Sequence, residues 1–258
     1  MTYRPTPKFV FVRSVWDLPS ESGGVITLED NTTYCFIDTV DLLGNRLVSG
    51  QNTTLQGGGS SENCRILSTG LTGQALITSQ WSLPMRFLTI EADIALALDA
   101  SGNAGSALDW IGVNFTNCAT VGTIANYTNF IGADCAFLNS QGLTFDGSIG
   151  TVGFQQTLFD NRSGGTSLIF APTLTITRRI RVIYSSFISL SGETALNVST
   201  SAVIPVESYI LDTCNFAGGG TYVTGVLNTD VKSFWLNCKG ISNTSKIGFY
   251  TMLSLIHI

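Results

Sequence analysis

The sequence predicts an all-β solenoid, in which short parallel strands coil into about ten rungs behind an N-terminal cap. A loose motif recurs along the chain as a short apolar run, then Asn, Ser or Cys, then Phe or Gly. Its successive markers are 22, 22, 28, 29 and 22 residues apart. A period of roughly 20 to 50 residues indicates stacked supersecondary units. The markers are Phe115, Phe137, Phe159, Phe187, Phe216 and Cys238.

The composition agrees with a coil of strands. Charged residues make up only 12% of the 258 residues, and 27 glycines accompany 6 prolines. A stack of short strands needs a continuous apolar interior and turn-forming residues, whereas helices would enrich Ala, Glu, Lys and Leu. The net charge of −5 argues against a general nucleic-acid binder, since such binders depend on clustered Lys and Arg.

Residues 1–23 are expected to form the cap. KFVFVR alternates as a strand does, and SVWDLPS favours a short helical turn with Ser14 or Asp17 near its cap. The alternative role for this segment is attachment to another protein. The opening lacks the apolar core of a signal peptide, and no apolar run approaches the ~20 residues of a membrane helix. We therefore expect no membrane insertion, and synthesis in a cytoplasm.

Residues 24–252 are expected to form the coil. Over 24–78, runs of 4 to 6 apolar residues alternate with Gly, Asn and Asp and leave no room for crossover helices. Each strand must then hydrogen-bond to the strand one full turn later. The GGG at 57–59 lacks the rest of a nucleotide-binding loop and is interpreted as a turn. EADIALALDA (91–100) favours a strand over a helix, with a lateral insertion left open.

Equivalent positions on successive rungs should lie above one another and form rows of like residues, Phe on Phe and Asn on Asn. The cysteines include no CxxC pair, which argues against a zinc site, and they favour buried thiols over disulfides. They are Cys35, Cys64, Cys118, Cys135, Cys214 and Cys238.

The last residues, LSLIHI (253–258), are expected to be non-native. The string CTGTCTCTTATACACATC encodes them in frame and resembles a transposon-end adapter of sequencing libraries. The gene model would then come from a metagenomic read, and the natural protein would continue beyond Met252. The only histidine, His257, lies in this tail.

No catalytic, cofactor-binding or metal-binding motif is present, so the sequence assigns no residue to those roles and predicts no cofactor. The enzymatic alternative is a carboxylate pair about 5 to 9.5 Å apart, as in glycoside hydrolysis. With 18 acidic residues, several close pairs are expected by chance. The candidates are Asp134, Asp146, Asp160, Glu193, Glu207, Asp212 and Asp230.

One basic cluster stands out, with Arg178, Arg179 and Arg181 in TITRRIRVIYSSF (175–187). In a strand, Arg179 and Arg181 share one face. The cluster is either a solvated outer face that blunts pairing between chains, or a contact for an anionic polymer or a neighbouring subunit. Aromatic side chains that would stack on sugars if exposed are Trp81, Tyr127, Phe130, Tyr184, Tyr209, Tyr222 and Trp235.

Over roughly residues 24–250, the period, the rows and the lack of helices resemble the right-handed parallel β-helix of the pectin lyase-like group. The opening, FVFVRSVWDLPS followed by GGVITLEDNTTYCFIDTVDLLGNRLVSGQNTTLQGG, is similar to the start of tail fibre and tailspike-type proteins of tailed bacteriophages. The Asp cluster of pectate lyases is missing, so their activity is not implied. The resemblance implies a homotrimer as one possible assembly. It also implies that residues 1–23 cap the β-helix.

The expected function is that of a structural or adhesive phage virion protein, a β-helical rod without catalysis that is located in the virion. Its expected partners are other virion proteins and a host surface polysaccharide, with no nucleic acid. The first alternative is a tailspike-type polysaccharide depolymerase, which would be a glycosidase or lyase that uses outer-face carboxylates. The weaker alternative is a bacterial β-helical surface protein.

Overall fold

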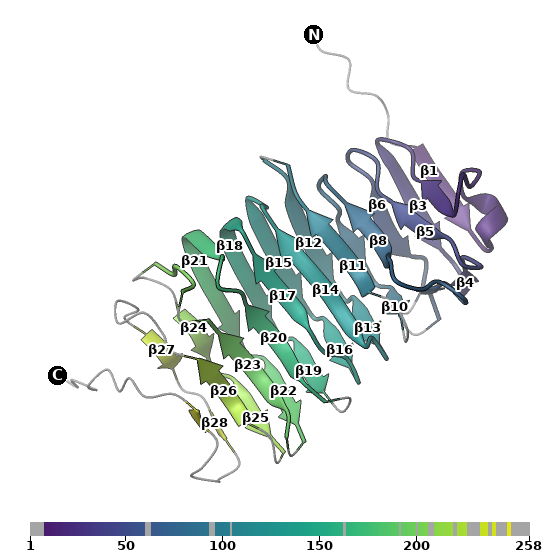
Figure 1. Ribbon diagram of the computed structural model, residues 1–258. Helices are drawn as coiled ribbons and strands as arrows, with labels where there is room; N and C mark the ends of the chain where they lie inside the picture. The colour runs from purple at the N-terminus through teal and green to yellow at the C-terminus, as the bar shows by residue number, and fades with distance from the viewer. Residues whose placement is uncertain are drawn as a thin grey trace.

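The computed structural model shows a parallel β-solenoid, a rod built from three long sheets (Figure 1). It describes residues 8–59, 63–92, 96–103, 105–161, 164–190, 192–199, 201–205, 209–218, 221–225, 233–236, 239–240 and 247–248. Side chains are described as far as residue 218, apart from Leu96, Tyr209 and Ile210. One 3-10 helix, η1 (Val15–Asp17), precedes the coil.

Sheet one has ten strands: β1 (Lys8–Val12), β3 (Thr32–Phe36), β6 (Thr54–Gly57), β9 (Met85–Arg86), β12 (Ala107–Ile111), β15 (Asn129–Ala133), β18 (Ser148–Gln155), β21 (Thr175–Ile183), β24 (Tyr209–Asp212) and β27 (Ser233–Leu236). Sheet two has nine: β4 (Val40–Asp41), β7 (Arg65–Leu67), β10 (Thr89–Glu91), β13 (Asn114–Thr116), β16 (Ala136–Leu138), β19 (Leu158–Asn161), β22 (Ser186–Ser189), β25 (Asn215–Ala217) and β28 (Lys239–Gly240). Sheet three has ten: β2 (Val25–Thr27), β5 (Arg46–Val48), β8 (Ala75–Ser79), β11 (Leu96–Ser101), β14 (Thr120–Ala125), β17 (Leu143–Asp146), β20 (Thr166–Phe170), β23 (Thr194–Val198), β26 (Thr221–Gly225) and β29 (Ile247–Gly248).

From β3 to β29 the chain visits sheets one, two and three in turn, and each strand pairs in parallel with the strand three later. The predicted all-β coil is confirmed. The described strands make nine complete turns, slightly fewer than the ten rungs expected. The right-handed sense stays a prediction, in line with the preference of parallel crossovers.

The row of phenylalanines is confirmed as the spine of the interior. Phe115, Phe137, Phe159, Phe187 and Phe216 stack with ring centroids 5.2, 4.9, 4.6 and 4.9 Å apart, and their planes differ by 5° or less. The final marker was wrong, because Gly240 rather than Cys238 pairs with Phe216. Cys238 itself lies outside the described residues.

The corner between sheets one and two explains why the motif carries polar residues. In each of the six turns from β9 to β25, one residue adopts a left-handed backbone there, and its N–H can donate to a carbonyl of the next turn, as Asp134 does to Gln155. The residue after it turns inward and bonds the carbonyl two positions back, as Cys135, Ser185 and Cys214 do. Small side chains that can donate a hydrogen bond, the thiol of Cys or the hydroxyl of Ser, fit this position. The left-handed residues are Phe87, Gly112, Asp134, Gln156, Tyr184 and Thr213, with φ from +50° to +61°.

The predicted Asn rows also form. Asn139 Nδ2 donates to Asn117 Oδ1 at 3.0 Å, and Asn52 Nδ2 donates to Asn31 Oδ1 at 3.1 Å. All four have positive φ, which Asn tolerates better than most residues. The five described cysteines are free and buried, as expected.

The N-terminal predictions hold locally. Lys8–Val12 of KFVFVR form β1, and the carboxylate of Asp17, the last residue of η1, accepts the backbone N–H groups of Arg13 and Ser14 at 2.9 and 3.0 Å. Val12 and Leu18 pack into the core. The strand favoured within EADIALALDA is β11, although residues 93–95 lie outside the described residues.

Candidate functional site

The carboxylates proposed as a catalytic pair are spread over different parts of the coil. Asp134 is exposed at the corner after β15, Asp146 ends β17 of sheet three, and Asp160 lies in β19 of sheet two. Asp212 ends β24 of sheet one. Glu207 and Asp230 lie outside the described residues.

Several of these carboxylates stabilise local backbone. The buried Glu193 accepts the N–H groups of Gly164 at 2.9 Å and Leu190 at 2.5 Å, which closes the loops on either side. Asp146 accepts the N–H of Gly147 at 2.6 Å and the hydroxyl of Thr173. These hydrogen bonds give both carboxylates a structural role, namely satisfying backbone N–H groups and a hydroxyl in the loops.

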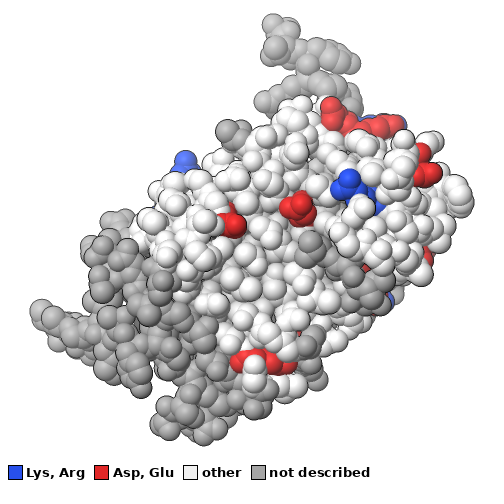
Figure 2. Space-filling view, viewed as in Figure 1, with Lys and Arg blue, Asp and Glu red and all other residues white. Residues whose placement is uncertain are grey.

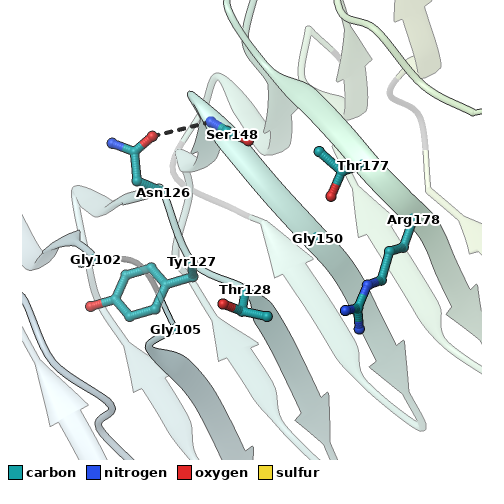
Figure 3. Close-up of a pocket in the computed structure, with 9 residues that line it drawn as sticks. All are labelled: Gly102, Gly105, Asn126, Tyr127, Thr128, Ser148, Gly150, Thr177 and Arg178. Carbon is teal, nitrogen blue, oxygen red and sulfur yellow. Dashed lines mark hydrogen bonds between the residues drawn. The ribbon is translucent and has the colours of Figure 1, made fainter.

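A groove lies at the corner where sheet three passes into sheet one (Figure 3). Its volume is about 370 Å³, which is within the range of small-ligand sites. Amide, hydroxyl and guanidinium side chains line it, and its lining contains no Asp, Glu or His. The lining residues are Gly102, Gly105, Asn126, Tyr127, Thr128, Ser148, Gly150, Thr177 and Arg178.

Close backbone approach requires the glycine in the groove floor. A Cβ on Gly150 would lie 2.1 Å from the carbonyl oxygen of Thr128. Asn126, with φ of +60°, turns the chain at this corner and accepts the N–H of Ser148 at 3.1 Å. The groove therefore has a rigid backbone floor with polar side chains at its rim.

Tyr127 belongs to the core rather than to a sugar-stacking surface. Its ring is buried, and its hydroxyl donates to the backbone carbonyls of Ser79 and Trp81 at 3.2 and 3.3 Å. Burial raises the pKa of Tyr127 to about 12. Tyr127 therefore does not meet the condition of exposure that sugar stacking requires, and neither does the buried Phe130.

A β-bulge places the arginines. The pairing of β18 with β21 shifts between Ile149 and Thr151, which face Ile176 and Arg179. Two residues of β21, Thr177 and Arg178, therefore lie opposite the single Gly150, so β21 carries one extra residue. Bulges redirect side chains and are frequent beside functional sites. Figure 3 shows Arg178 extending from β21 at the opposite end of the group from Asn126.

The arginine cluster, defined as Arg178, Arg179 and Arg181, is exposed throughout, while Ile180 and Val182 point into the core. The shared face predicted for Arg179 and Arg181 is confirmed. The ion pairs among the described residues join Lys8 to Glu29, Arg65 to Glu91 and Arg86 to Asp109, so none of them neutralises the cluster.

Two of the proposed sugar-stacking aromatics are accessible. Tyr184 is 59% exposed and Trp81 is 36% exposed. Tyr209, Tyr222 and Trp235 lie in strands, but their side chains are outside the described residues. Sequence reasoning missed the bulge, because only the pairing register shows it, and it missed the exposed Phe87 and Ile131.

The wider surface carries few charges. Figure 2 shows isolated acidic and basic side chains on a mostly uncharged face. Within the described ranges, no group of three or more His, Cys, Asp or Glu is placed to hold a metal ion. The same ranges contain no helix of the length and hydrophobicity needed to cross a bilayer. No protein-family model and no curated protein matches the sequence.

Proposed function

We propose that this chain is a structural and adhesive component of a phage virion, a β-solenoid rod that binds a surface glycan without cleaving it. The observation that carries the binding role is the groove at the corner of sheets three and one, with its backbone floor and polar rim. Stacked rungs give such a groove a rigid support.

The placement in a phage virion depends on the resemblance of the opening to tail fibre and tailspike-type proteins and of the coil to the pectin lyase-like group. The parallel solenoid supports this proposal, since an extended stack suits a part that reaches out from a particle. A depolymerase would need an acid and a second carboxylate across the sugar. The groove lining contains neither, so we propose binding without cleavage.

Binding of the fluorescently labelled chain to wells coated with purified bacterial capsular polysaccharides tests the proposal. The expected result is saturable binding to at least one polysaccharide. Ser148→Trp, which fills the groove from an exposed position, should abolish it. Thr123→Trp, on the outer face of sheet three, is the matched control and should bind as the parent does. Absence of binding across the panel, or equal binding by both variants, would overturn the proposal.

A further inference from the structure

The arginine cluster is a concentrated positive charge on an acidic protein. The chain carries 18 acidic and 13 basic residues, yet three of the arginines fall within four consecutive positions. All three are exposed, and they take part in none of the ion pairs among the described residues. Neighbouring cations repel one another, so an unneutralised cluster costs stability unless a ligand supplies the counter-charge.

The bulge converts this cluster into a row. Arg179 and Arg181 both project from the outer face of β21, about 7 Å apart at about 3.3 Å per residue. Arg178, which lies in the bulge, stands at the groove end of the row. The row therefore runs along β21, across the rod axis, from the groove toward the corner with sheet two.

The surface beside the row is low and apolar. On β18, the residue paired with Arg181 is Gly153, which carries no side chain. Ile131 on β15, next to Gly153 in register and 40% exposed, adds apolar surface. Beyond the row, Tyr184 stands exposed at the corner, about 20 Å from Arg178 along the strand.

The described residues place few acidic groups around this surface, and Glu207, just before β24, lies outside them. Asp109 on β12 pairs with Arg86. Asp212, which pairs in register with Ile183, is half-buried and accepts the hydroxyl of Thr213 at 2.9 Å. Asp134 is exposed at the corner, two turns before Tyr184. Asp134 and Asp212 lie at the end of the row beside sheet two. Near the groove end, Asp146 accepts the N–H of Gly147 and the hydroxyl of Thr173, and Asp99 is exposed on β11. Among the described residues, none of these carboxylates forms an ion pair with the arginines.

From this arrangement we infer that the chain binds an acidic glycan, a sugar polymer with carboxylate groups, laid along β21 from the groove to Tyr184. Arg178, Arg179 and Arg181 contact successive anionic groups, since guanidinium forks match carboxylates. The Tyr184 ring supplies a face for an uncharged part of the chain. A single cluster of three arginines on a chain of net charge −5 suits a polymer held through a few carboxylates better than a nucleic acid, whose affinity depends on many Lys and Arg contacts to phosphates. The inference rests on the proposed adhesive function and specifies its ligand.

Binding to polygalacturonate, with neutral dextran and a short DNA duplex as comparison probes, tests the inference by biolayer interferometry at two salt concentrations. We expect binding to polygalacturonate that weakens as salt rises, and no binding to dextran. Each arginine is expected to contribute at most the free energy of one exposed ion pair. Arg181→Gln should therefore weaken binding about fivefold, and the triple Gln variant on the order of 100-fold. The triple Lys variant, which keeps the charge, should stay within about fivefold of the parent.

Arg13→Gln removes the same charge from an exposed position just after β1 and is the matched control, with binding unchanged. Circular dichroism melting of each variant checks that the coil is intact. Equal affinity of the parent and the triple Gln variant, or binding only to dextran, would refute the acidic-glycan inference while leaving the adhesive function standing. Tighter binding to DNA than to polygalacturonate would also refute it. Failure to bind these probes and every capsular polysaccharide would remove both proposals.

Discussion

The phenylalanine spine makes a quantitative prediction at its centre. Phe159 is 1% exposed, and its ring lies 4.9 Å from Phe137, 4.6 Å from Phe187 and 5.2 Å from Phe154. Phe159→Ala should lower the free energy of unfolding by about 4 to 5 kcal/mol, the upper part of the range for buried Phe, because two stacked contacts and one edge contact are lost with the buried area.

Urea unfolding measures the loss, and native-state amide exchange locates it. A solenoid passes strain mainly to its neighbouring turns, so exchange should accelerate first in β16, β19 and β22. Phe11→Ala, on β1 at 62% exposure, is the matched control and should cost no more than about 1 kcal/mol. Equal losses for the two variants, or exchange that accelerates uniformly along the rod, would refute the spine as the source of stability.

Two further predictions concern backbone approach and buried thiols. Gly122→Ala should prevent soluble expression, because its Cβ would lie 1.7 Å from the carbonyl oxygen of Leu98. Gly59→Ala, with open space around the added Cβ, is the control and should melt at the same temperature as the parent. A soluble Gly122→Ala variant with an unchanged melting temperature would contradict this prediction. Burial raises the pKa of Cys118 and Cys135 to about 12 from an ordinary 9.0, so their stabilisation is complete below pH 9 and falls as the pH rises toward 12. Urea unfolding at pH 8 to 11 should therefore show a shallower loss for Cys135→Ala than for the parent, and identical slopes would exclude the thiol as a cause.

Much of the fold could be predicted because a coil repeats its constraints. A Phe that faces inward on one turn is followed by a Phe one turn later, so the spacing in the sequence reports the stacking directly, as Phe115 and Phe137 show. Asn rows were predictable for the same reason. The spacing failed at Cys238. This residue fits the motif in the sequence, but it lies two positions before Gly240, the residue that pairs with Phe216, and only the strand register distinguishes the two positions.

The candidate site could be predicted only in part. The alternation in TRRIR is enough to place Arg179 and Arg181 outward, since Ile180 and Val182 need the interior. The exposure of Arg178 depends on the bulge, and the bulge arises where β21 carries one residue more than β18 over the same span. Whether Tyr127 or Tyr184 faces solvent is decided by corner geometry, because the left-handed residue points out and the next one points in.

The central claim is that the rod binds a surface glycan through its outer face and leaves it intact. Size-exclusion chromatography of a bound capsular polysaccharide after incubation with the chain, combined with a reducing-end assay, tests this most directly. The account predicts saturable binding, an unchanged polysaccharide length and no new reducing ends. Shortening of the polymer that disappears when an exposed carboxylate such as Asp134 is replaced by Asn would contradict it.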